Sequence, residues 1–144
     1  MSGSDVRKIK KLAARLGVHD SDIVRFAVKS MLARLEPLHD TDARGRSVLP
    51  VFVESGDELV RFFELDALRL DIIINEGVEQ TRRVDRDDVA LIAMHAMQQP
   101  FAAMKLSEIA PSASGEGGTV HTLRRYLYEK YARRTSAEAG VNHE

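Results

Sequence analysis

Residues 4–36, SDVRKIKKLAARLGVHDSDIVRFAVKSMLARLE, decide how the first part of the chain folds. The spacing of their apolar residues predicts two helices, over residues 4–16 and 20–35, separated by a turn at Gly17. Ser4 and Asp20 are the expected N-caps because their side chains accept hydrogen bonds from exposed backbone N–H groups. The first helix has a single apolar stripe, with Lys and Arg over the remainder.

The second of these helices is apolar over more than half of its surface, which is more than one neighbouring helix can cover. A second copy of the same helix is the simplest partner, so a homodimer or a higher even oligomer is expected. Packing against the rest of the chain is the alternative. The predicted dimer interface consists of Ile23, Val24, Ala27, Val28, Met31, Leu32 and Leu35.

Charge is unevenly distributed along the chain, although its formal net charge is only −1. Residues 1–46 carry ten Lys and Arg against six Asp and Glu, whereas residues 47–99 carry five against eleven. A basic N-terminal segment before an acidic remainder suits a protein whose N-terminal segment binds a polyanion. The alternative is that these cations only form a solvated helix face. The candidate phosphate contacts are the cations of the first helix: Arg7, Lys8, Lys10, Lys11 and Arg15.

The turn and the start of the second helix, Leu16-Gly17-Val18-x-x-Ser21-Asp22-Ile23-Val24-Arg25-x-Ala27-Val28, resemble those of ribbon-helix-helix transcriptional regulators. The resemblance covers residues 4–35 and implies an intertwined dimer that binds double-stranded DNA. It also implies that backbone N–H groups around Asp20 and Ser21 hold a DNA phosphate, because a helix N-terminus favours an anion.

In that family a short strand precedes the first helix and reads bases in the major groove, and no residue of this sequence matches its positions. Either residues 1–5 form an imperfect strand, or the strand is lacking here, or the fold is kept for dimerisation alone. The spacing Ala13-x3-Gly17-x5-Ile23 also fits a helix-turn-helix, in which residues 20–35 would enter the groove and Arg25 would reach a base or phosphate.

The remainder of the chain predicts a small α+β domain over residues 47–110, a flexible linker over 111–118 and a C-terminal helix over 119–136. Within the domain we expect a strand at 47–53, a helix opened by a capping box at 55–58, and a hairpin of strands at 69–75, which includes the Ile run 72–74, and 78–84. A single helix over 57–75 is the competing interpretation. Helices are expected at 85–99 and 100–109. The predicted fold class is α+β, mostly helical, with residues 1–38 as a separate module.

The composition argues against several classes of protein. There is no Cys, no His spacing typical of a metal site and no phosphate-binding glycine loop, so we expect no enzyme, no catalytic residue, no metal and no cofactor. No apolar run is long enough to span a bilayer, so we expect a cytoplasmic protein without membrane contact.

The sequence therefore predicts a dimeric DNA-binding transcriptional regulator, such as a repressor. Residues 47–136 would oligomerise or sense a protein partner or ligand. The alternative is a non-enzymatic protein-interaction adaptor, or an antitoxin, that uses the helical module only to dimerise. Affinity for duplex DNA that falls steeply with salt would distinguish the first function from the second.

Overall fold

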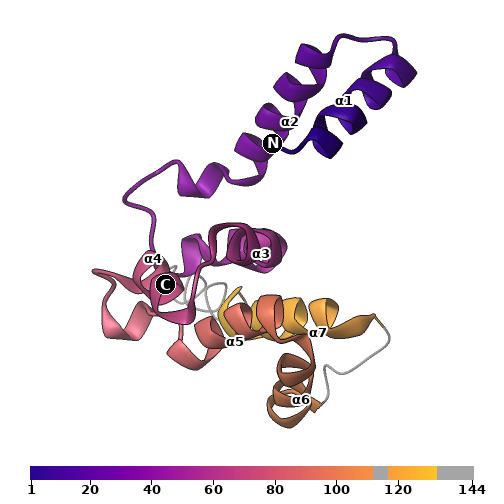
Figure 1. Cartoon of the computed structure of the whole chain (residues 1–144). Coiled ribbons are helices and arrows are strands. Elements are labelled where there is room, and N and C mark those ends of the chain that lie inside the picture. The colour runs from indigo at the N-terminus through magenta and orange to yellow at the C-terminus, as the bar shows by residue number, and fades with distance from the viewer. Residues whose placement is uncertain (112–116, 133–144) are drawn as a thin grey trace, which may run out of the picture. The chain divides into compact units, whose positions relative to one another are not determined.

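A computed structural model of the chain describes residues 1–111 and 117–132. The chain divides into two compact units, residues 1–39 and residues 40–144, and each is described here by itself. The described residues form seven α-helices and no strand, so the fold is all-α (Figure 1). The α+β class predicted from the sequence was therefore wrong, and so was the α+β domain at 47–110.

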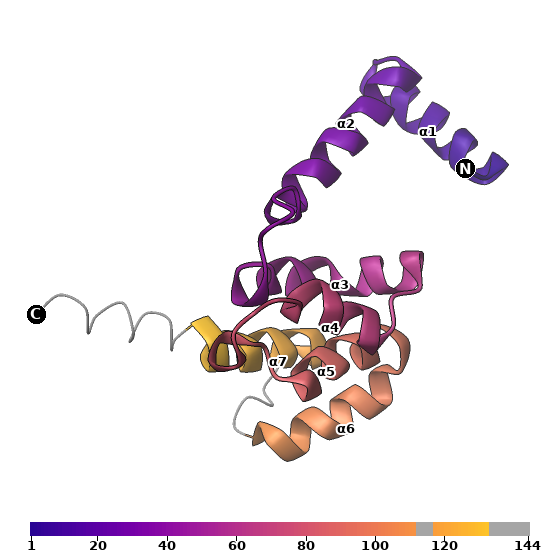
Figure 2. The same cartoon turned by 90° about the vertical axis from the view of Figure 1, so that its left-hand side faces the viewer.

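Unit 1, residues 1–39, is a pair of helices, α1 (Gly3–Leu16) and α2 (Asp20–Arg34), followed by a short 3-10 turn η1 (Glu36–Leu38). Gly17 ends α1 with φ of 68°, a left-handed conformation that a glycine adopts without strain. The two helices diverge from this turn (Figure 2).

The helix starts in unit 1 lie close to the predicted positions, but their caps are different residues. The N-cap of α1 is Ser2, whose hydroxyl oxygen accepts a 3.1 Å hydrogen bond from the Asp5 N–H, while the Asp5 carboxylate accepts from the Ser2 N–H at 3.0 Å. The N-cap of α2 is His19, whose N–H donates to the Asp22 carboxylate at 3.0 Å. Ser4 and Asp20 both lie inside their helices.

Unit 2, residues 40–144, contains the remaining elements. Its helices are α3 (Leu49–Phe63), α4 (Ala67–Asn75), α5 (Arg86–Met97), α6 (Gln99–Ile109) and α7 (Gly118–Leu127), with 3-10 turns η2 (Gly45–Ser47) and η3 (Gln80–Arg82) and a terminal π-helix η5 (Tyr128–Ala132). Helix α5 contacts α3, α4, α6 and α7 and so forms the centre of the unit (Figures 1 and 2).

The core of unit 2 lies around α5, whose Val89 and Ile92 side chains are almost fully buried. Gly56 on α3 is also buried, and a Cβ atom there would lie 3.2 Å from Ile92 Cγ2. The absence of a side chain at Gly56 therefore lets the backbone of α3 approach α5 closely.

The strand predicted at 47–53 is instead the start of α3, and the predicted capping box at 55–58 lies in the middle of that helix. Pro50 occupies the first turn of α3, where the backbone N–H that proline lacks would have no helical partner. Pro50 therefore opens a helix here.

The predicted hairpin at 69–84 is also absent, because residues 69–75 belong to α4 and 80–82 form η3. Leu70 and Ile74, four residues apart, are fully buried on one face of α4. Asn75 holds the returning segment: its Nδ2 donates to the Val84 carbonyl at 2.8 Å, and its Oδ1 accepts from the Val84 N–H at 2.9 Å. The side-chain amide of Asn75 thus makes the two backbone hydrogen bonds with Val84 that a neighbouring strand would have made.

The later helices agree more closely with the sequence pattern. The helix predicted at 85–99 is α5, and the one predicted at 100–109 is α6, with Pro100 in its first turn. The predicted linker at 111–118 lies mostly outside the described residues. The C-terminal helix predicted at 119–136 is α7 followed by η5 up to Ala132, and its last four positions lie outside the described residues. Among the described helices, none is long and apolar enough to cross a membrane.

Candidate functional site

The most strongly charged surface of unit 1 is one side of α1, which we call the basic face. It consists of five exposed cations, Arg7, Lys8, Lys10, Lys11 and Arg15. At 3.6 residues per turn these positions fall within about 160° of the helix circumference. The apolar residues Ile9 and Ala13 lie on the opposite side, where Ala13 is buried.

The only acidic residue of α1 is Asp5, which lies in the first turn, three positions before Lys8 of the basic face. Hydrogen bonds from the Ser2 side chain and backbone lower the pKa of the Asp5 carboxyl, so this group stays ionised and caps the helix. Lys8 is the one cation of the basic face whose charge contributes to this lowering, and Asp5 is the only carboxylate of α1.

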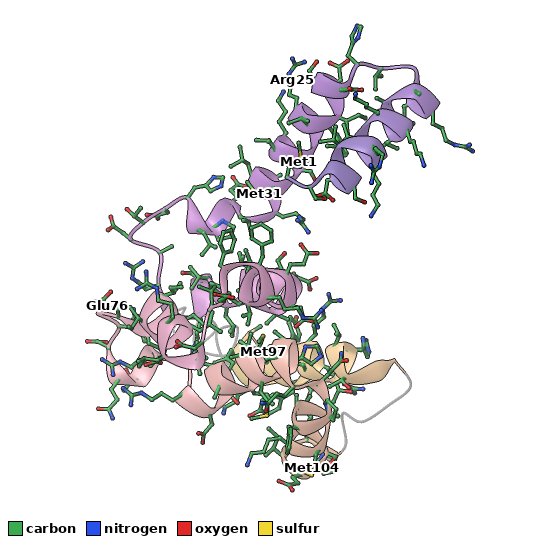
Figure 3. The ribbon with its side chains drawn as sticks, in the orientation of Figure 1. Met1, Arg25, Met31, Glu76, Met97 and Met104 are labelled. Atoms are coloured by element: carbon green, nitrogen blue, oxygen red, sulfur yellow. The ribbon has the colours of Figure 1, made fainter. Side chains whose placement is uncertain are left out.

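Helix α2 leaves most of its apolar residues exposed. Within residues 1–39, all of which are described, Ala13 is the only buried residue. The predicted interface residues Val24, Val28, Met31 and Leu32 are each more than 40% exposed. Ala27 is exposed as well, and Ile23 and Leu35 are partly buried. All seven lie on α2 or at its C-cap, and Figure 3 labels Met31 there.

Phe26 is a residue that the sequence interpretation missed. Its side chain is 73% exposed, the most of any large apolar residue on α2. Its exposure adds to the apolar area that unit 1 leaves uncovered.

The predicted phosphate site at the start of α2 borders a shallow hollow of about 550 Å³. Its lining includes Lys10 from α1 together with Asp20 and Ser21 from α2. Exposed backbone N–H groups and Lys10 attract an anion, whereas the Asp20 carboxylate repels it. The hollow is therefore less suited to a phosphate than the basic face.

Arg25, predicted to contact DNA, is on the surface of α2. Its Nη1 donates to Asp22 Oδ1 at 3.3 Å in an exposed pair of the kind that contributes little to stability. The side chain remains accessible, but it has a carboxylate neighbour.

In unit 2 the carboxylate of Asp88 on α5 accepts hydrogen bonds from three side chains of the chain's last helical segment. Its Oδ1 accepts from Tyr126 Oη at 2.8 Å, and its Oδ2 accepts from Lys130 Nζ at 2.7 Å and from the Tyr131 hydroxyl. The Asp85 N–H in turn donates to Tyr131 Oη at 2.9 Å. Asp88 is 2% exposed. Because its oxygens are bonded, this cluster fastens η5 to α5 and leaves no open position for a substrate.

His95 on α5 pairs with a carboxylate of α3. Its Nδ1 is 2.7 Å from Asp57 Oδ1, and the imidazole is 1% exposed. Among the described residues, no group of three or more His, Asp or Glu side chains is arranged to hold a metal ion.

Comparisons with protein-family models, curated proteins and solved structures found no match to the chain. The ribbon-helix-helix resemblance was wrong as an assignment, because that fold needs a β-strand and the described part of the chain has none. The physical reason for the error is that a Gly-containing turn and an amphipathic second helix are shared by many helical pairs.

Proposed function

We propose that the chain is a homodimeric DNA-binding regulator in which α2 pairs with α2 of a second copy and the basic face of α1 contacts DNA phosphates. The observation that carries this proposal is the basic face itself: five exposed cations on one side of a helix whose other side is apolar. Such a row of Lys and Arg releases counterions from DNA when it binds.

The pairing part of the proposal is supported by the small core of unit 1. A 39-residue unit is close to the lower size limit for independent folding, and this one buries only Ala13. Covering the exposed apolar residues of α2 would stabilise it by roughly 25 cal/mol per Å² removed from water. Two copies would also place two basic faces in one particle, which doubles the number of phosphate contacts.

No residue is proposed to read bases. The described part of the chain has no strand to enter a groove, and the exposed polar side chains of α2 include few that suit base edges. The expected binding is therefore governed by phosphate charge, with little dependence on sequence.

Gel shifts on duplex DNA at several salt concentrations test the proposal. Replacing Lys8, Lys10 and Lys11 together by alanine removes six positive charges from a dimer. We expect weaker binding to all duplexes, and a slope of log affinity against log salt that is smaller by up to about 5 units.

The matched control removes three exposed cations of unit 2 instead, by replacing Arg69, Arg82 and Lys105 with alanine. The net charge of this control equals that of the first variant, so any difference in DNA affinity between the two variants reports the position of the removed charges. Equal binding by the two variants would show that the basic face has no special part in DNA binding.

A second candidate function, that of a protein-interaction adaptor, is favoured by exposed apolar residues in unit 2. Met97, Phe101 and Met104 are 66%, 57% and 56% exposed around the corner between α5 and α6 (Figure 3). A photo-crosslinking residue at position 101 would give a discrete heterologous product under this function. The same residue at position 105, on the same helix, would give less of it.

A further inference from the structure

Unit 2 contains an apolar groove between the start of α3 and the segment α7–η5, which borders the Asp88 cluster at Tyr131. Its volume is about 730 Å³, within the usual range for small-molecule sites. Leu49, Leu127 and Tyr131 line it and are themselves buried, so they form its floor. Pro50, Val53 and Tyr128 form its walls.

Three arginines line the same groove, and they outnumber its acidic residues. Arg46 comes from η2, and Arg124 and Arg125 come from α7, while Glu54 is the one carboxylate in the lining. Arg124 Nη2 lies 3.0 Å from Glu54 Oε2, and Arg125 Nε lies 3.3 Å from Glu129 Oε1. Each of these two arginines therefore already has a carboxylate partner.

Arg46 has no carboxylate within ion-pair distance among the described residues. Its guanidinium instead lies 5.5 Å from the centre of the Tyr131 ring at the groove floor. The Arg46 Nε and Arg124 Nε atoms are buried and have no hydrogen-bond partner in the described structure. A half-buried cation with an unsatisfied donor is costly, and an anion beside it lowers that cost.

We propose that this groove binds a fatty acid, with the carboxylate at the Arg46 guanidinium and the hydrocarbon chain along Leu49, Leu127 and Tyr131. An apolar floor beside an excess of positive charge fits a ligand with one anionic head and an apolar body. A cationic amphiphile would be repelled by the arginines, and a ligand polar over its whole length would leave the floor uncovered. The assignment goes beyond the proposed function and stands whether or not unit 1 binds DNA.

Isothermal titration calorimetry of the full-length protein with decanoate and with 1-decanol tests separately how the charged head group and the hydrocarbon chain of the ligand contribute to binding. The two ligands share a hydrocarbon chain and differ in the charged head. We expect saturable binding of decanoate and weaker binding of decanol. In Arg46→Gln, binding of decanoate should weaken by about tenfold or more, because a charge-assisted hydrogen bond is lost, while binding of decanol should not change.

Arg69→Gln is the matched control, because Arg69 is exposed on α4 and does not line the groove. It should bind decanoate as the wild type does. Val53→Glu places a charge in the groove wall and should abolish binding of both ligands.

Several results would overturn the proposal. These are no saturable decanoate binding, equal affinities for decanoate and decanol, or equal effects of Arg46→Gln and Arg69→Gln. If Arg46→Gln does not fold, amide chemical-shift mapping of the wild type with decanoate decides. Shifts confined to residues 46–54 and 121–132 support the site, and shifts elsewhere refute it.

Discussion

His95 shows how much a single buried polar residue can depend on one partner. Its Nδ1 lies 2.7 Å from Asp57 Oδ1, while its Nε2 is buried and without a hydrogen-bond partner among the described residues. The imidazole is 1% exposed, whereas the Asp57 side chain is 37% exposed, so the pair lies at the boundary of the core. Asp57 therefore supplies the interaction that makes the burial of this ring tolerable.

Replacing Asp57 by alanine should lower the free energy of unfolding by about 1–3 kcal/mol, because both ring nitrogens of His95 would then be buried without a partner. Urea denaturation followed by circular dichroism measures the change. Asp87→Ala, an exposed acid on α5, is the control and should have a much smaller effect. A stability loss at Asp57 no larger than at Asp87 would contradict the interpretation.

The sequence could not reveal the pairing of His95 with Asp57. His95 and Asp57 are 38 positions apart, and no motif links them. The basic face, by contrast, was predictable in full, because five cations at helical spacing depend only on local sequence. Candidate sites within one helix can thus be read from periodicity, whereas the groove needs residues from η2, α3, α7 and η5 to be brought together.

At the scale of elements, the errors of prediction lie in short apolar segments. Residues 47–53 and 72–74 are rich in Val and Ile, which favours strands, yet both belong to helices. Burial against α5 outweighs the weak intrinsic preference of these residues. The long helices with polar and apolar sides, α1 and α2, were predictable, because their period extends over several turns.

The attachment of η5 to α5 should depend on pH. Burial lowers the pKa of Lys130, but its hydrogen bonds to Asp85 and Asp88 outweigh this effect, so the pKa lies above its ordinary value of 10.5. Burial, followed by the bond to Asp88, raises the pKa of Tyr131 above its ordinary value of 10.0. Both groups therefore bind protons more tightly in the folded state.

The contribution of this cluster to stability is complete below about pH 10, where both groups are protonated also in the unfolded chain. It is lost progressively as the pH rises above the ordinary pKa values of 10.0 and 10.5, so the free energy of unfolding should fall from about pH 10 upward. Asp88→Asn should make this fall shallower. Urea denaturation across the range provides the measurement, and an equal slope in both proteins would exclude the cluster as its source.

At the scale of the whole molecule, the two units differ in how they are stabilised. Among the residues that the structure describes, nineteen of the twenty buried apolar ones belong to unit 2, and Ala13 alone belongs to unit 1. Unit 2 thus has a core of its own, whereas unit 1 exposes the side chains from which a core would be built.

Met31→Asp should convert a dimer into a monomer, because it places a charge at the centre of the proposed α2 pairing. Light scattering after gel filtration should then report the chain mass of 16.1 kDa in place of twice that value. Lys29→Asp, on the opposite side of α2, should remain dimeric. A wild type that is already monomeric would rule out the pairing.

The single buried side chain of unit 1 has a consequence for the degradation of the protein in a cell. Where pairing of two copies supplies most of the stability of unit 1, the fraction of folded α1–α2 pairs rises with the concentration of the protein. Newly made or scarce copies would hold α1 and α2 loosely, with the backbone next to Lys8, Lys10 and Lys11 open to trypsin-like proteases. Proteases would then degrade unpaired copies before paired ones. The protein would therefore persist only at concentrations high enough for its copies to pair.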